Sequence, residues 1–180
     1  GGETRLLIQV IDFLVVRRRP DPEKYFRRYL EITEHYRKEL GPISDGEIRE
    51  TLLAMTDRER SRVMTPRDFE SLQQGFRERV TDMDQDHIRD LPGTLPGIFA
   101  QAAARAQKAG FDGVELHYAH AYTMASFLSA LNTRPDGYGG SRENRVRLPL
   151  EVYRDVRNAV SDSFAVGCRY LSEECIPGGN

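Results

Sequence analysis

The sequence predicts an α/β fold built from parallel β/α units. Three short segments that are rich in apolar residues have the composition of buried strands: residues 6–16, 111–117 and 164–169. The connections between them are long and have helical patterns, which is typical of parallel strands joined by crossovers. The predicted class is therefore a (β/α)8 barrel of the TIM type. A complete barrel needs about 250 residues, so we expect 180 residues to form a partial barrel with about three parallel strands.

The N-terminal half is expected to hold one strand followed by helices. The strand reads LLIQVIDFLVV, in which Gln9 and Asp12 interrupt an apolar run. Asp21 followed by Pro22 is a typical helix start. From there to about residue 90 the chain is charged and helical, so we expect a single domain over residues 1–180 with a helical insertion at about 21–90.

The C-terminal half has a more regular pattern. Residues 91–97, LPGTLPG, are expected to interrupt the chain before an alanine-rich helix over 98–109. A second strand, a long loop and a helix over 142–161 follow, the helix in spite of Pro149. The third strand then reads FAVGCR.

Composition narrows the functional classes. The formal net charge is −2, so no basic field suggests nucleic acid as a partner. No apolar run approaches the roughly 20 residues that span a bilayer, and the first residues lack the pattern of a signal peptide. The two cysteines, Cys168 and Cys175, are consistent with free thiols in a reducing compartment. These observations predict a cytoplasmic protein without a membrane segment.

Three chemically active side chains follow the second strand. His117 and His120 are three residues apart, and Tyr122 comes two residues later. In a β/α barrel the catalytic groups lie where strands end and loops begin, so these three are candidates for an active site. A purely structural role for the histidines is the alternative. A zinc site is a further alternative for His-x-x-His, but no third ligand at metal spacing is evident, so no metal site is predicted.

Residues 96–176 also carry a family resemblance. The stretch GFDGVELHYAHAYTMASFLSALNTRPDGYGGSRENRVR, followed by FAVGCRYLSEE, resembles the old yellow enzyme family of FMN-dependent NADH:flavin oxidoreductases. Those enzymes are built on a β/α barrel. The resemblance implies FMN as cofactor and NAD(P)H as reductant, with hydride passed to an activated alkene or a similar electron-poor acceptor. The implied substrate is a small molecule with a carbonyl or nitro group.

The resemblance also implies a role for five residues. His117 and His120 would donate hydrogen bonds to the acceptor oxygen, and Tyr122 would donate a proton to carbon. Gln9 would contact the pyrimidine edge of the flavin, and Arg169 would face its N1 and O2 atoms. For Gln9 the alternative is a backbone or water partner, and for Arg169 it is an ordinary ion pair.

Two departures from the family pattern are expected to affect the pocket. Ala121 stands where the family usually has glycine, and Tyr118 replaces a small residue between the histidines. The loop residues Asn132, Arg134, Asp136 and Tyr138 are expected to organise their loop through hydrogen bonds.

A different class of function is also consistent with the sequence. The chain could be a non-catalytic partial barrel that serves as a scaffold or an interaction module. An open three-stranded sheet exposes hydrogen-bonding edges and apolar surface. This alternative therefore predicts a homo-oligomer or a complementing chain.

Overall fold

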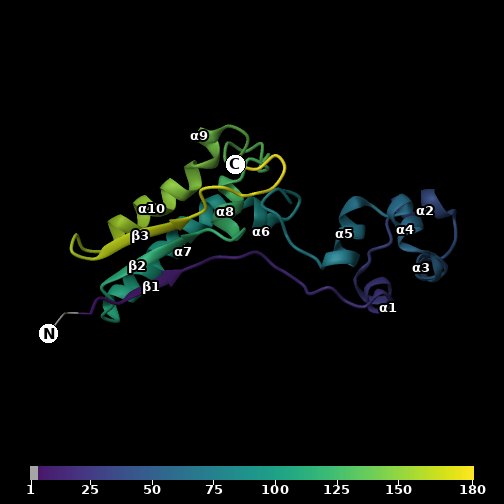
Figure 1. The fold of residues 1–180 in the computed structure, drawn as a ribbon, viewed down its shortest axis with the longest axis horizontal. Helices are drawn as coiled ribbons and strands as arrows, with labels where there is room; N and C mark the ends of the chain where they lie inside the picture. The colour runs from purple at the N-terminus through teal and green to yellow at the C-terminus, as the bar shows by residue number, and fades with distance from the viewer. Residues whose placement is uncertain (1–3) are drawn as a thin grey trace. The chain divides into compact units, whose positions relative to one another are not determined.

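The computed structural model describes residues 4–180 and contains the predicted parallel sheet (Figure 1). Its strands are β1 (Leu7–Val10), β2 (Gly113–Tyr118) and β3 (Ala165–Tyr170), in the order β1-β2-β3. Both pairings are parallel. The α/β class is confirmed, and three parallel strands with crossover helices correspond to part of a (β/α)8 barrel.

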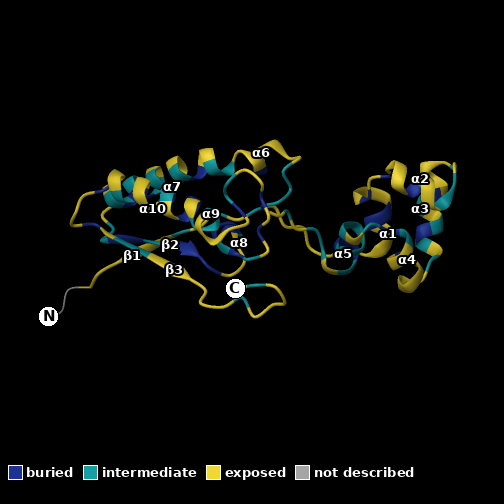
Figure 2. Ribbon diagram, turned by 90° about the horizontal axis from the view of Figure 1, so that it is seen from above, coloured by how far each residue is buried: buried dark blue, intermediate teal, exposed yellow. Residues whose placement is uncertain are grey.

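Helices cover one face of the sheet. The two long helices, α7 (Leu91–Lys108) and α10 (Arg147–Ala159), lie on the same side of the strands (Figure 2). Val114, Leu116 and Tyr118 of β2 belong to the apolar core on that side. Because side chains alternate along a strand, Glu115 and His117 lie on the opposite face. The sheet thus has an apolar helix-covered face and a polar face.

The first strand is shorter than predicted. Residues 6–16 were expected to form one strand, but β1 ends at Val10. Beyond that point the chain leaves the ladder: the Asp12 carbonyl accepts a hydrogen bond from the backbone N–H of Thr123. Val16 forms an isolated antiparallel bridge with Arg77. The apolar pattern continues past residue 10, but the strand pairing does not.

Prolines do not break helices where the sequence suggested. Helix α7 begins at Leu91 and includes both prolines of the LPGTLPG segment. Pro92 occupies the first turn, where a missing N–H costs nothing. The predicted helix 142–161 is divided at Val146 into α9 (Arg142–Arg145) and α10, so Pro149 also falls in a first turn. The remaining helices of this part are α6 (Asp86–Arg89) and α8 (Thr123–Leu128).

The chain forms two compact units, where the sequence predicted a single domain. One unit comprises the described residues up to Leu14 together with 79–180, and the other comprises Val15–Glu78. The second unit is helical, as expected for the insertion, and has an apolar core of its own that includes Phe26, Tyr36 and Leu52. This separate core explains the division. Its elements are α1 (Pro22–Lys24), a π-helix η1 (Tyr25–Tyr29), α2 (Glu34–Leu40), α3 (Asp45–Ala54), α4 (Asp57–Val63) and α5 (Pro66–Gln74).

Part-buried hydrogen bonds to Asp68 stabilise the second unit. One carboxylate oxygen of Asp68 accepts from the Tyr36 hydroxyl at 2.6 Å and from the Thr65 hydroxyl at 2.7 Å. Tyr25 donates to the Asp68 carbonyl at 2.9 Å. These bonds satisfy the hydroxyls of two tyrosines that are themselves buried in the apolar core.

Within residues 4–180, no helix is long and apolar enough to cross a membrane.

Candidate functional site

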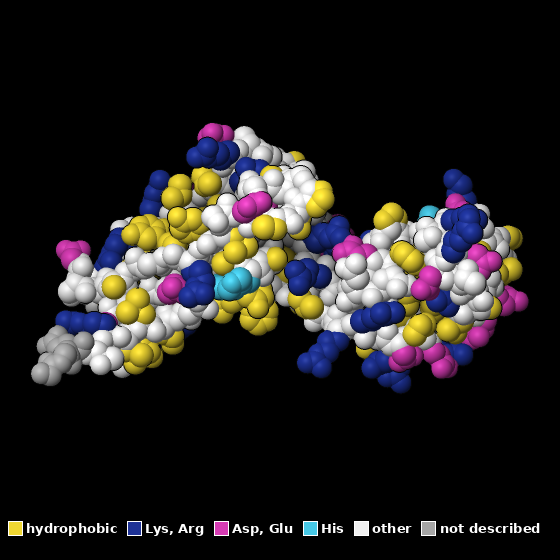
Figure 3. Space-filling model, in the orientation of Figure 1, with side chains coloured by type: hydrophobic (Ala, Val, Ile, Leu, Met, Phe, Trp, Pro, Cys, Tyr) yellow, Lys and Arg dark blue, Asp and Glu magenta, His cyan; other side chains and the backbone are white. Residues whose placement is uncertain are grey.

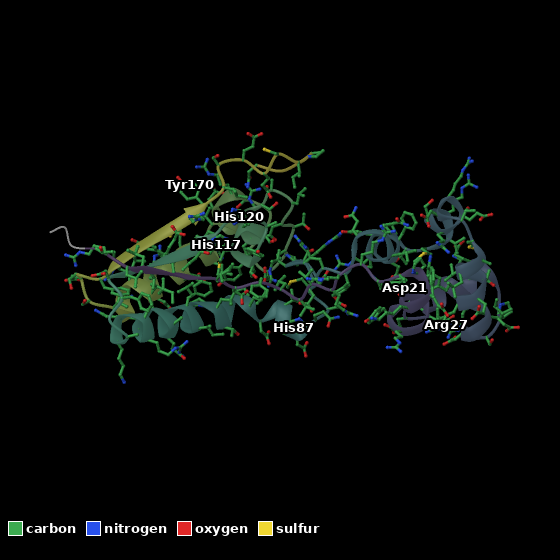
Figure 4. All side chains as sticks on the ribbon, turned by 60° about the horizontal axis from the view of Figure 1, so that its bottom comes forward. Asp21, Arg27, His87, His117, His120 and Tyr170 are labelled. Atoms are coloured by element: carbon green, nitrogen blue, oxygen red, sulfur yellow. The ribbon has the colours of Figure 1, made fainter. Side chains whose placement is uncertain are left out.

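The two predicted histidines meet at the C-terminal end of β2. His117 lies in the strand and is 3% exposed, whereas His120 lies in the following loop with a φ of 59°. Their side chains are neighbours in Figure 4, and His120 Nδ1 is 3.1 Å from His117 Nε2. Tyr122 is the residue at the N-cap position of α8, and its ring centroid lies 5.5 Å from that of His117 and 6.5 Å from that of His120. The structure therefore brings the three candidates together.

The distance between the two histidine rings restricts which nitrogen of each ring carries the proton. At 3.1 Å one nitrogen must donate and the other accept. His117 Nδ1 is buried and has no hydrogen-bond partner among the described residues. A proton on that atom would be a buried donor without an acceptor, which is costly. The favoured arrangement therefore has the proton of His117 on Nε2, donated to His120, and the proton of neutral His120 on its Nε2.

His117 is held in its neutral form. Burial lowers its pKa below the ordinary value, and electrostatic interactions with His120 and Arg169 lower it further. Glu115 acts in the opposite direction but has the smallest effect. A neutral imidazole at this position is a hydrogen-bond donor and not a general acid.

A second set of polar side chains extends across all three strands on the same face of the sheet as His117. Gln9 on β1 is opposite Glu115 on β2, and Arg169 on β3 is opposite His117. Gln9 Nε2 donates to Glu115 Oε1 at 2.6 Å, and Arg169 Nε donates to the same oxygen at 3.0 Å. Figure 3 shows histidine, basic and acidic side chains side by side on this part of the surface. The two predicted flavin contacts are thus joined through one carboxylate.

Glu115 was missed by the sequence prediction, although a signal for it was present. It lies two residues before His117, and Val114 and Leu116 between and beside them are buried. Alternation places positions 115 and 117 on the same face of the strand. The spacing could have identified Glu115 as a neighbour of the site.

Tyr118 does not narrow the site, contrary to expectation. It lies on the helix-covered face, and its hydroxyl donates to the Pro149 carbonyl at 3.0 Å. Ala121, at the usual glycine position, has a φ of 56°. This left-handed conformation is one that glycine adopts without strain, which gives a physical reason for the family preference.

The loop after α8 is organised as predicted, around a buried arginine. Arg134 is buried, and its Nη1 donates to the carbonyls of Val80 and Ile88 at 2.7 and 2.9 Å. It also forms an ion pair with Asp136. The Asn132 side chain donates to the Phe127 and Tyr138 carbonyls at 2.9 and 2.8 Å. These contacts fix the loop that follows the candidate site.

No group of three His, Cys, Asp or Glu side chains that could hold a metal ion occurs within residues 4–180.

Comparisons with known proteins agree on one family. The model of the NADH:flavin oxidoreductase / NADH oxidase family matches residues 39–178. NADH oxidase of Thermoanaerobacter brockii is 46% identical over 83 residues, which is 46% of this chain and 13% of that protein. Probable N-methylproline demethylase of Rhizobium meliloti (strain 1021) is 39% identical over 112 residues, 61% of this chain and 15% of the relative.

A solved structure of morphinone reductase in complex with tetrahydroNAD matches with 44% identity and a TM-score of 0.42, covering 45% of this chain and 22% of that one. The chain therefore spans less than a quarter of the length of these relatives. The family match nevertheless covers most of the chain. The chain belongs to the NADH:flavin oxidoreductase / NADH oxidase family, whose cofactors are FMN and a reduced nicotinamide.

Proposed function

We propose that the protein is an FMN-dependent oxidoreductase of the old yellow enzyme type. It passes hydride from NAD(P)H, by way of FMN, to an activated alkene or a similar electron-poor acceptor. The observation that carries the proposal is the meeting of His117, His120 and Tyr122 at the end of β2, directly beside Arg169 on the neighbouring strand. A polar sheet face next to a histidine pair provides separate groups for a cofactor and for an acceptor.

The side chains on this face fit the pyrimidine edge of a flavin. That edge carries carbonyl oxygens and an imide N–H, so it needs both donors and an acceptor. The hydrogen bond from Gln9 to Glu115 uses the amide nitrogen and leaves the carboxamide oxygen as an acceptor. The ion pair from Arg169 uses Nε and leaves the two terminal nitrogens as donors. A fixed positive charge near the ring also favours its reduced, anionic form.

The histidines would bind the acceptor. Donors aimed at a carbonyl or nitro oxygen polarise the conjugated double bond and stabilise the negative charge that develops on that oxygen. In the structure the Nε2–H of His117 is donated to Nδ1 of His120, so an acceptor oxygen would take this hydrogen bond in place of His120, and the lowered pKa of His117 keeps its ring neutral. FMN, when bound, supplies the hydride for this chemistry.

Tyr122 would supply the proton. Its side chain is 39% exposed and lies beside both histidine rings. A phenol in that position can protonate the carbon next to the polarised group. The oxygen would then be held by the histidines while the carbon receives its proton from the tyrosine.

The test separates the two half-reactions by rapid mixing without oxygen. The protein is first loaded with FMN and reduced with NADH or NADPH, and it is then mixed with an α,β-unsaturated ketone or a nitroalkene. Tyr122→Phe should slow reoxidation by the alkene, or change its product, by a factor of about 10² to 10⁴ and leave reduction by the nicotinamide unchanged. Equal rates and products for the wild type and Tyr122→Phe would remove the tyrosine from the mechanism.

The acceptor assignment is tested with the same protein. Replacing His117 and His120 together by alanine should abolish reoxidation by the alkene, while reduction of the bound FMN continues. A wild-type protein that binds no FMN would instead favour the scaffold interpretation, and its oligomeric state would then be the next property to measure.

A further inference from the structure

We propose that Glu115 is a positioning residue, which fixes the orientation of Gln9 and Arg169 toward the flavin ring. This inference rests on the proposed function, because it concerns the same cofactor. The assignment comes from its place on the middle strand, between two side chains that reach it from either side.

The geometry makes Glu115 the centre of the polar face. One oxygen, Oε1, accepts from both Gln9 Nε2 at 2.6 Å and Arg169 Nε at 3.0 Å. The three residues lie on β1, β2 and β3, so a single carboxylate links the whole width of the sheet. The Gln9 hydrogen bond lowers the pKa of Glu115, and Arg169 lowers it further through a hydrogen bond and its charge. Glu115 is therefore ionised at neutral pH.

An ionised carboxylate removes the ambiguity of a glutamine side chain. A carboxamide can present either its oxygen or its nitrogen to a ligand, but a carboxylate only accepts hydrogen bonds. Glu115 therefore holds the nitrogen of Gln9 and directs the oxygen away from itself. The flavin would meet an acceptor at this position, which suits the imide N–H of the ring.

The same carboxylate restrains Arg169 and moderates its charge. With Nε bound to Glu115, the guanidinium plane is fixed while its terminal nitrogens remain available. The negative charge also reduces the positive potential that the arginine contributes at the ring. Removing that charge should stabilise the anionic reduced cofactor and shift the reduction potential of bound FMN to a more positive value.

Glu115→Gln tests both effects with little change in shape. The new amide can donate to the oxygen of Gln9 and so allow the reversed orientation of that side chain. We expect about tenfold weaker FMN binding, which corresponds to the loss of one well-oriented hydrogen bond. We also expect a more positive reduction potential. Glu143→Gln, at an exposed position on α9, is the matched control and should change neither quantity.

A double-mutant cycle separates positioning from a general structural effect. FMN affinity is measured by visible difference titration for the wild type, Glu115→Gln, Gln9→Ala and the double variant. If Glu115 acts through Gln9, its substitution should have much less effect on affinity in the Gln9→Ala background. Glu115→Asp, which keeps the charge but shortens the side chain, should weaken binding and leave the potential close to that of the wild type.

These measurements distinguish a failure of the proposed function from a failure of the role of Glu115. A wild-type protein that binds no FMN would contradict the proposed function and the inference with it. A wild type that binds FMN, with Glu115→Gln equal to it in affinity and potential, would overturn the inference alone. Strictly additive effects in the cycle would also overturn it, because Glu115 would then not act through Gln9.

Discussion

Nε2 of His117 lies 3.1 Å from Nδ1 of His120, so a single proton is shared between the two nitrogens when both rings are neutral. The buried, unpaired Nδ1 of His117 favours placing that proton on His117. In this state His120 accepts at the point where an acceptor oxygen would bind. For both histidines to donate to the acceptor oxygen, His120 needs a proton on Nδ1. It can move its proton there from Nε2 or bind a second proton.

A side chain with a permanent donor at position 120 should therefore keep or improve ligand binding. An asparagine amide always carries two N–H groups. With FMN bound, we expect His120→Asn to bind a phenol at least as tightly as the wild type at pH 8, whereas His120→Ala binds it about tenfold or more weakly. Spectral titration with a phenol measures this, and equal losses in both variants would show that the donor is not what matters at position 120.

The lowered pKa of His117 predicts how stability depends on pH. Its folded-state pKa is below the ordinary value of 6.5, so at pH values between the two the unfolded chain binds more protons. The free energy of unfolding should be unaffected by His117 above about pH 6.5 and should fall as the pH decreases through this window. His117→Asn cannot titrate and should lose less stability between pH 7.5 and pH 5 than the wild type does. Urea unfolding at both pH values makes the comparison, and an identical loss would contradict it.

Replacing Ala121 by glycine should stabilise the protein. The left-handed conformation, with a φ of 56°, destabilises a non-glycine residue by roughly 1–2 kcal/mol. Glycine removes this strain, but its greater freedom in the unfolded chain lowers the free energy of unfolding by about 0.4–1 kcal/mol. We expect Ala121→Gly to stabilise the protein by up to about 1.6 kcal/mol. Ala125→Gly, within α8, is the matched control and should destabilise it by about 0.5–1 kcal/mol. A loss of stability in both variants would argue against the left-handed conformation at position 121.

Arg134 should be the least replaceable charged residue of the loop. It is buried and donates to the carbonyls of Val80, Ile88 and Arg89 as well as to Asp136. A lysine cannot reproduce this fork of donors, and Arg134→Lys should cost about 1–3 kcal/mol, because it leaves buried carbonyls without a donor. Arg89→Lys, whose side chain is half exposed in a surface ion pair, should cost less than about 1 kcal/mol. Chemical denaturation distinguishes the two, and similar small costs would contradict the structural role of Arg134.

The sequence predicted the sheet and the histidine site because both depend on local pattern. Apolar and polar residue types alternate from Val114 to His117 in β2, and His120 and Tyr122 follow within one short loop. Their meeting therefore needs little information from distant parts of the chain. The first strand instead ends at Val10, opposite Leu116, although its partner β2 continues to Tyr118. The apolar pattern beyond Val10 was misleading because it does not show where the chain leaves the sheet.

Other features required the folded structure. Val15–Glu78 is a separate unit because it has an apolar core of its own, and that core depends on contacts between several short helices. Glu115 became part of the site only when the strand register placed Gln9 and Arg169 within reach of its carboxylate. A single glutamate in a strand gives no sign of its cross-strand partners unless the order of the strands is known.

We expect this protein to hold FMN against the polar face of the sheet, and a visible spectrum can detect this binding. The protein is purified, FMN is added without oxygen, and the spectrum is recorded before and after addition of NADH or NADPH. We expect flavin bands shifted from those of free FMN and bleached by the nicotinamide, with a weaker shift when both Gln9 and Arg169 are replaced by alanine. A spectrum identical to that of free FMN would contradict the proposed flavin site, and an equal shift in the double variant would place the flavin elsewhere.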